Sequence, residues 1–243
     1  MKISRYEAAG LKCVEVAPEN CEDRNLPLVI IMHGRGDWGE SYVGFADMIS
    51  MDNYRFIFPT APLPLPGAYF EWFRFDQSNL GGNTAGARPV VTALLDDLRQ
   101  RYQMPANKIV LGGFSQGGMM TLEVGLRYPE KLAGLVALSS FLVANAPFNW
   151  LSPGSTQEYY LNDQGDLEAV VNEAGKRKVP IFIGHGTYDS VVPVLAGRAT
   201  RDLLKQAGAL VEYYEFPGDH EISMEELEEI NAFLAKVLST STL

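Results

Sequence analysis

A serine flanked by glycines, in the run Gly113-Phe114-Ser115-Gln116-Gly117, has the spacing of a nucleophile elbow. An apolar stretch, 109–112, precedes the run and a helix-like stretch, 118–126, follows it. We therefore expect Ser115 at a tight turn between a strand and a helix, with a strained backbone and glycines that let the chains pass closely. Its hydroxyl would then lie at a helix N-terminus, where backbone N–H groups favour negative charge. This arrangement predicts nucleophilic chemistry.

A nucleophilic serine needs a histidine base and a carboxylate that orients the histidine. The chain has three histidines, His33, His185 and His220. His33 and His185 end apolar, strand-like runs, whereas His220 follows the run 211–216 and a turn. In proteins with this elbow the nucleophile, the acid and the base follow one another along the chain, which selects His220. The alternative interpretation of His220 is a solvated turn histidine.

The best candidate for the acid is Asp189, because it lies on a loop after a predicted strand and between the nucleophile and the base. Asp219 competes because it precedes His220 directly. Neighbouring side chains in an extended loop point apart, however, so we prefer Asp189. Other aspartates are interpreted as helix caps or solvated groups, namely Asp163, Asp166 and Asp202.

Acyl transfer also requires donors for the developing oxyanion, and two backbone N–H groups serve best. One should be the amide of Gln116, directly after the nucleophile. The glycine-rich loop His33-Gly34-Arg35-Gly36-Asp37 should supply the other from the amide of Arg35. The alternative for this loop is a plain turn between a strand and a helix.

Several runs of the chain together resemble one family. They are 33–37, Pro59-Thr60-Ala61-Pro62, Trp72-Phe73, 111–118, His185-Gly186 with Asp189 and Val192-Pro193, and His220-Glu221-Ile222. In this order they are similar to the phospholipase/carboxylesterase group of α/β-hydrolases, which includes the acyl-protein thioesterases. The resemblance implies Ser115 as nucleophile, Asp189 as acid, His220 as base, and the amides of Arg35 and Gln116 as oxyanion donors.

Two features depart from that family. Asp219 stands where the family usually has glycine, which predicts a second carboxylate near the imidazole and a raised pKa of His220. Compact members also pass quickly between the strand after the elbow helix and the strand before the acid, whereas this chain carries an insertion around 145–178. We expect the insertion to cover part of the active site.

The chain of 243 residues suits a single α/β domain, 1–243, of the α/β-hydrolase fold. Strands are predicted near 12–16, 28–32, 55–58, 108–111, 135–138, 179–183 and 211–216. Helices are predicted near 40–50, 87–102, 117–128, 193–207 and 225–238. Their alternation predicts a mostly parallel central sheet with helices on both faces.

An aromatic run, 69–75, has two interpretations. As structure it is a loop folded onto the core. As function it lines a substrate pocket beside Ser115, at the strand ends where such sheets bind ligands. Trp72 and Phe73 are the candidate substrate-binding residues.

Composition narrows the class of protein. A net charge of −10, without a basic cluster, disfavours nucleic acid as a partner. The start of the chain lacks the apolar core of a signal peptide and no stretch suits stable membrane insertion, so we expect a cytoplasmic protein. Cys13 and Cys21 are expected as free thiols. Asp37, Glu71 and Asp76 lack clustered histidines, so no metal is expected.

These features predict a serine carboxylesterase that hydrolyses a small ester or acyl substrate through an acyl-enzyme, without a cofactor. Acyl thioesterase, lysophospholipase or dienelactone-type hydrolysis would use the same residues. A different class, a non-catalytic ligand-binding protein on the same scaffold, stays open because fold does not determine function. A homodimer is compatible with the sequence.

Overall fold

A computed structural model describes residues 1–19, 21, 26–49, 53–75, 80–143 and 164–239. The strands are β1 (Lys2–Ala8), β2 (Leu11–Ala17), β3 (Leu28–Met32), β4 (Arg55–Pro59), β5 (Leu63–Leu65), β6 (Tyr69–Glu71), β7 (Ile109–Phe114), β8 (Gly134–Leu138), β9 (Pro180–Gly186) and β10 (Leu210–Phe216). The helices are α1 (Val43–Met48), α2 (Leu80–Tyr102), α3 (Gln116–Gly125), α4 (Gln164–Arg177), α5 (Val194–Gln206) and α6 (Met224–Ser239). None of the helices in these ranges has the length and apolarity needed to cross a membrane.

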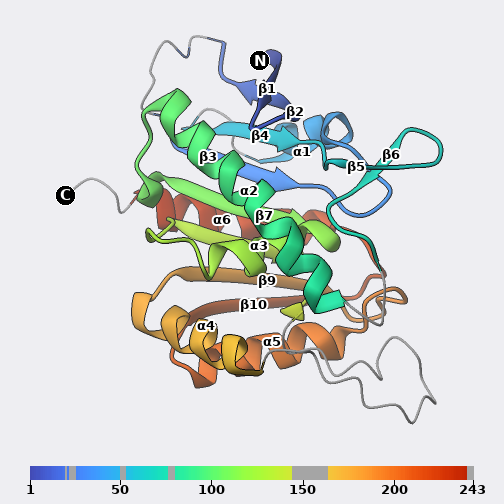
Figure 1. Cartoon of the computed structure of the whole chain (residues 1–243), viewed down its shortest axis with the longest axis vertical. Coiled ribbons are helices and arrows are strands. Elements are labelled where there is room, and N and C mark those ends of the chain that lie inside the picture. Colours follow the sequence, from blue (N-terminus) through green and yellow to red (C-terminus); the bar gives the residue numbers. More distant parts are fainter. Residues whose placement is uncertain (20, 22–25, 50–52, 76–79, 144–163, 240–243) are drawn as a thin grey trace.

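The central sheet has eight strands in the order β1-β2-β4-β3-β7-β8-β9-β10 (Figure 1). From β4 to β10 every neighbouring pair is parallel. Only β2 breaks the pattern, because it is antiparallel to both β1 and β4. The predicted α/β-hydrolase fold, with a mostly parallel sheet and helices on both faces, is confirmed in this arrangement.

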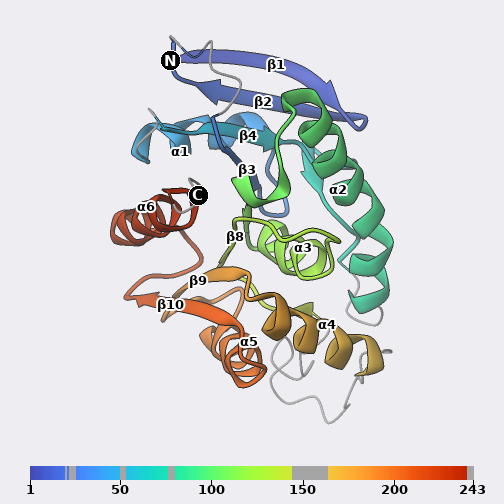
Figure 2. The same ribbon diagram turned by 90° about the vertical axis from the view of Figure 1, so that its left-hand side faces the viewer.

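Two hydrophobic cores lie on the two faces of the sheet, because successive side chains of a strand point to opposite sides. In β3, Leu28, Ile30 and Met32 pack with side chains of α2, α3, α4 and α5. Val29 and Ile31 pack on the other face with α1 and α6. Figure 2 shows these two layers on either side of the sheet.

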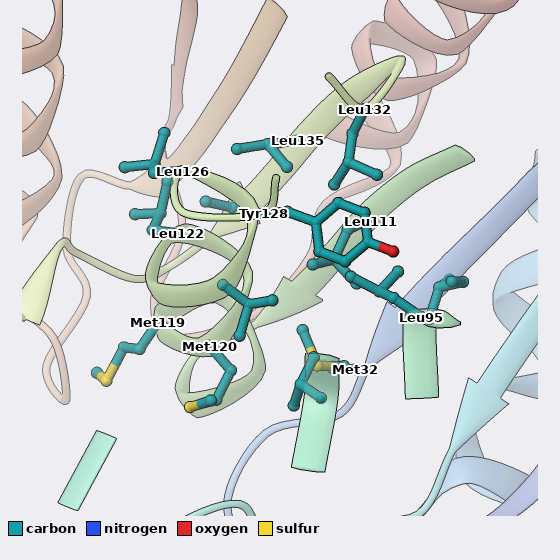
Figure 3. Packing of buried hydrophobic residues seen from close by; sticks show 14 of the residues in the cluster. Met32, Leu95, Leu111, Met119, Met120, Leu122, Leu126, Tyr128, Leu132 and Leu135 are labelled. Carbon is teal, nitrogen blue, oxygen red and sulfur yellow. The ribbon is translucent and has the colours of Figure 1, made fainter. Parts of the chain in front are cut away.

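Helix α3 lies at the centre of the larger core, and all of its residues are buried. Met119, Met120 and Leu122 belong to the same cluster as Met32 of β3 and Leu111 of β7 (Figure 3). Burial of an apolar side chain of this size contributes about 1.5–3 kcal/mol. Packing thus fixes α3, and with it the turn that precedes the helix, relative to two strands.

Two predicted helices have different bounds in the structure. The helix expected at 40–50 is a 3₁₀ turn, Gly39–Tyr42, followed by the short α1. Helix α2 begins at Leu80 rather than near 87, and it contains Pro89. Glycine and proline weaken a helix, which explains why the first turns of α2 were not predicted. Packing of α2 against the core overrides this weakness.

Three strands were also not predicted. β1 is an edge strand whose residues are mostly exposed, so it lacks the apolar run on which the prediction relied. It joins β2 through Ala9 and Gly10, whose φ angles of 50° and 77° suit a two-residue hairpin. β5 and β6 form a separate two-stranded hairpin of three residues per strand.

The structure describes only part of the insertion. Its first part, 145–163, lies outside the described residues, so coverage of the active site stays a prediction. The rest of the insertion forms α4, whose sequence is mostly polar. Val170, Val171 and Ala174 of α4 are buried in the larger core.

Candidate active site

Ser115 occupies a sharp turn between β7 and α3, as the glycine spacing predicts. Its φ and ψ angles are 53° and −117°. This conformation is energetically unfavourable for any residue other than glycine. Two hydrogen bonds hold the turn: the Ser115 N–H donates to Leu138 O at 2.8 Å, and the Met119 N–H donates to Ser115 O at 3.0 Å.

The glycines on either side allow the close approach that the turn needs. A Cβ at Gly113 would lie 2.8 Å from Met32 O, and one at Gly117 would lie 2.7 Å from His33 O. Such distances are too short for non-bonded atoms, so alanine at either position would push the turn away from the end of β3. The glycines therefore hold Ser115 beside the loop that follows β3.

Asp189 and His220 form a hydrogen-bonded pair. Asp189 follows β9 and His220 follows β10, so the parallel pairing of these strands places both at one edge of the sheet. The Nδ1 atom of His220 lies 2.8 Å from Oδ2 of Asp189. Since ionised carboxylates accept and do not donate, the proton is on Nδ1, and Nε2 of His220 is left with a lone pair.

Asp189 is ionised by its surroundings. Burial alone would raise its pKa, but hydrogen bonds from His185, His220 and the Val192 N–H lower the pKa well below its ordinary value. The Val191 and Val192 amides donate to Oδ1 at 2.9 and 2.7 Å. The group facing His220 is therefore a fixed negative charge.

His185 is a second, fully buried neighbour of Asp189. Its Nε2 atom lies 2.8 Å from Val192 O and 3.4 Å from Oδ2 of Asp189. Because both neighbours are acceptors, the proton of His185 is on Nε2. His185 thus ties the carboxylate to the loop that carries it, a contact that the sequence did not indicate.

Asp219, the rival acid, contacts a different part of His220. Its Oδ1 atom accepts the Ser190 N–H at 2.7 Å, the Ser190 hydroxyl at 2.8 Å and the His220 backbone N–H at 2.8 Å. Hydrogen bonds from Ser190 and His220 lower the pKa of Asp219. Asp219 therefore joins the loops after β9 and β10, whereas the imidazole binds Asp189, as preferred from the sequence.

His220 reaches the elbow through an aromatic contact. Its ring packs on Phe114, the residue before Ser115, with centroids 4.7 Å apart. No hydrogen bond between the Ser115 hydroxyl and His220 is formed among the described residues. Catalytic hydrogen bonds in unliganded sites are often longer than in complexes with substrate. The structure thus brings Ser115, Asp189 and His220 to one edge of the sheet and joins the last two directly.

The glycine-rich loop after β3 lies beside Ser115. A Cβ at Gly34 would be 3.5 Å from the Cβ of Ser115, which places the amide of Arg35, the next group along the chain, near Ser115. Gly36 has a φ of 86°, and its N–H donates to Phe70 O at 2.9 Å. The Arg35 side chain turns away, because its Nε atom donates to Glu71 at 2.8 Å.

Gln116 lies at the start of α3. The Met119 N–H makes the first backbone bond of the helix, to Ser115 O, so the Gln116 amide precedes the hydrogen-bonded turns. The Gln116 side chain is buried and binds the aromatic segment: Oε1 accepts the Trp72 N–H at 2.7 Å and Nε2 donates to Phe73 O at 2.8 Å. The sequence suggested the amide of Gln116 but not this side-chain role.

Trp72 and Phe73 are buried, with 1% and 2% of their surface exposed. The Trp72 indole N–H donates to His33 O at 2.9 Å, which fastens the segment to the glycine-rich loop. Their positions agree with the interpretation of the run as a loop folded onto the core. Contact of either residue with substrate stays a prediction.

His33 has a structural position. Its Nε2 atom accepts the Ala61 N–H at 3.0 Å, and its Nδ1 atom lies 2.7 Å from Gly34 O. Burial lowers the pKa of His33 and favours the neutral ring. Within the described ranges, no three His, Cys, Asp or Glu side chains gather as metal ligands. Cys13 and Cys21 are not joined in a disulfide.

Named proteins match this chain over most of its length. The Neurospora crassa protein named acyl-protein thioesterase 1 is 34% identical over 235 residues, which cover 88% of each chain. The Gibberella zeae protein of that name is 31% identical and covers 86% of this chain and 90% of its own.

Solved structures share the fold over most of the chain. Esterase PE8 is 26% identical with a TM-score of 0.73, covering 98% of this chain and 100% of its own. Arabidopsis thaliana SOBER1 is 26% identical with a TM-score of 0.68, covering 87% and 99%. A family model described as phospholipase/carboxylesterase matches residues 12–174 and 160–238. The chain therefore belongs to the phospholipase/carboxylesterase family of α/β-hydrolases.

Proposed function

We propose that the protein is a serine carboxylesterase with Ser115 as nucleophile, His220 as base and Asp189 as the orienting acid. The observation that carries the proposal is the 2.8 Å hydrogen bond between His220 Nδ1 and Asp189, at the sheet edge where the strained turn presents Ser115. A structural histidine in a turn has no need of a buried, ionised partner. A catalytic base needs one, because the carboxylate selects the tautomer.

The reaction follows from the tautomer. Nε2 of His220 takes the proton of the Ser115 hydroxyl while Oγ attacks the carbonyl carbon of the ester. The amides of Arg35 and Gln116 donate to the oxygen that becomes negative. The intermediate then expels the alcohol, which takes the proton from His220. Water attacks the acyl-enzyme in the same way and releases the acid, so the cycle requires no cofactor.

A second candidate function is thioester hydrolysis. The relatives at 34% and 31% identity carry the name acyl-protein thioesterase 1, and thioesters react through the same groups. Turnover of an ester and a thioester with the same acyl chain separates the two proposals. Lysophospholipase and dienelactone-type activity would appear in a wider substrate panel, and a non-catalytic binding protein would turn over none of these compounds.

We further propose a single-domain, cytoplasmic enzyme that acts on a small ester or acyl substrate, as a monomer or a homodimer. The net charge of −10 supports the absence of nucleic acid among its partners.

Covalent labelling tests the nucleophile. A fluorophosphonate should modify Ser115 and should fail to modify a Ser115→Ala variant, because only a serine with an adjacent base is activated. Ser139→Ala is the matched control, since Ser139 is a buried serine at the end of the neighbouring strand β8. Label on Ser139, or turnover retained by Ser115→Ala, would overturn the assignment.

A further inference from the structure

A buried carboxylate beside the oxyanion loop holds two arginines. Glu71, at the end of β6, is 1% exposed. Its Oε2 atom accepts Nε–H of Arg35 at 2.8 Å, and its Oε1 atom accepts an Nη1–H of Arg74 at 2.7 Å. Each carboxylate oxygen thus orients one guanidinium group.

The two guanidinium groups face solvent. The side chains of Arg35 and Arg74 are 52% and 59% exposed, against 2% for Glu71. A guanidinium has five N–H donors, and each arginine directs one nitrogen at Glu71. Within the part of the chain that the structure describes, the other donors of both arginines bind no protein acceptor. The cluster also carries a net charge of +1 in a chain of net charge −10.

Burial of Glu71 does not by itself require this arrangement. Elsewhere in the chain a single arginine binds both oxygens of one carboxylate: Arg198 donates to the two oxygens of the partly buried Glu215 at 2.7 and 2.6 Å. Another buried glutamate with two arginines, Glu123, differs because one of its partners, Arg127, is only 11% exposed. Among the ion pairs of the described residues, only those of Glu71 involve two arginines that each expose half or more of the side chain.

Both arginines adjoin the proposed oxyanion donors. The backbone amide of Arg35 is itself one donor. Arg74 follows Phe73, whose carbonyl accepts a hydrogen bond from the side chain of Gln116, the residue that provides the other donor. Both guanidinium groups therefore belong to the two segments of the chain that carry or support the proposed oxyanion donors.

We propose that Arg35 and Arg74 form a binding site for a carboxylate group of the ester substrate. A guanidinium fork matches a carboxylate in geometry and charge, and Glu71 holds both forks in place before the substrate arrives. The inference rests on the proposed esterase function of Ser115, and it names the substrate class of that site: esters that carry a free carboxylate.

Matched pairs of esters test the site. On the acyl side, the mono-p-nitrophenyl ester of glutaric acid is compared with p-nitrophenyl valerate. On the alcohol side, the butyryl ester of glycolic acid is compared with ethyl butyrate. We expect kcat/KM to favour the carboxylate member of at least one pair by about tenfold, which corresponds to about 1.4 kcal/mol.

Two variants distinguish the arginine site from general charge effects. Arg74→Gln should reduce the preference to near unity, and Arg74→Lys, which keeps the charge without the fork, should retain part of it. Lys236→Gln is the control, because it removes the same positive charge from an exposed ion pair with Glu212. Glu212 lies near the start of β10, at the end of the strand away from His220, so this variant should leave the preference unchanged.

A measurement on the wild-type enzyme guards against misfolded variants. Raising the ionic strength from about 0.01 M to about 1 M should weaken the preference, because exposed charges are screened. Equal kcat/KM values within both pairs, with turnover of the neutral esters, would overturn the carboxylate site and leave the esterase proposal standing. Failure to hydrolyse any of the four esters would overturn both.

Discussion

Glu226 is a buried carboxyl group that takes no part in the proposed chemistry. It lies in the first turn of α6, six residues after His220, and its side chain is fully buried against Gly184 of β9. Neither carboxyl oxygen has a hydrogen-bond partner among the described residues. Only its backbone N–H is bonded, to the Ser223 hydroxyl at 3.1 Å.

This environment makes the stability of the protein depend on pH. Burial raises the pKa of Glu226 from its ordinary value of 4.5 to about 8. Between these values the folded protein binds one more proton than the unfolded chain, so stability falls by about 1.4 kcal/mol per pH unit as pH rises. The contribution is fully present below pH 4.5 and lost through pH 8. From pH 4.5 to pH 7 the loss is about 3 kcal/mol.

Glu226→Gln removes the titration. We expect the free energy of unfolding of the variant, relative to wild type, to rise by about 1.4 kcal/mol per unit between about pH 5 and pH 8. Urea unfolding at several pH values measures the difference. Glu225→Gln is the control, because Glu225 is an exposed residue of the same helical turn and its replacement should leave the pH dependence of stability unchanged.

The slope, and not the offset, is the decisive quantity. A glutamine in this place buries an amide with its own unpaired groups, which shifts stability equally at every pH. A difference between Glu226→Gln and wild type that does not change with pH would refute the reasoning. It would mean that Glu226 is ionised in the folded protein at neutral pH.

Two further predictions concern the site. Asp189→Asn should lower kcat by roughly 10³ to 10⁴, because an amide no longer selects the catalytic tautomer of the base; Asp219→Asn should cost about tenfold or less, since an amide oxygen still accepts from Ser190. Steady-state kinetics on one ester ranks them, and the reverse order would reassign the acid. Gly117→Ala should destabilise the protein by about 1–3 kcal/mol through its clash with backbone carbonyls, whereas Gly86→Ala, with open space in α2, should stabilise it by about 0.5–1 kcal/mol. Thermal unfolding measures both, and equal shifts would contradict the packing argument.

The parts of the fold that the sequence predicted are those with a local signal. β3, Leu28–Met32, is an apolar run and was predicted with its observed bounds. The elbow was also predictable, because a strained turn requires glycine at fixed positions around one serine. By contrast, β1 is an exposed edge strand that is defined by its pairing with β2. The local sequence of such a strand does not indicate the strand with which it pairs.

The order of the candidate site residues along the chain could be predicted from the sequence. The buried side chains that hold these residues in place could not. Asp189 could be preferred over Asp219 because adjacent side chains diverge, and the structure pairs Asp189 with His220. Nothing in the sequence around Glu71 or Glu226 distinguishes either residue from an exposed glutamate. Their burial depends on the folded structure. Glu71 is paired with Arg35 and Arg74, whereas the carboxyl oxygens of Glu226 have no hydrogen-bond partner among the described residues.

The buried segment around Trp72 is one such group of side chains that hold the candidate site in place. One neighbour, Gln116, follows Ser115, and the other, His33, begins the loop that carries Arg35. The segment binds both, through its backbone and its indole, so it fixes the distance between the two proposed oxyanion donors. Those donors come from parts of the chain that are about eighty residues apart, and neither motif alone sets their separation. The precision of the site is therefore a property of the buried segment between the motifs, which has no catalytic signature of its own.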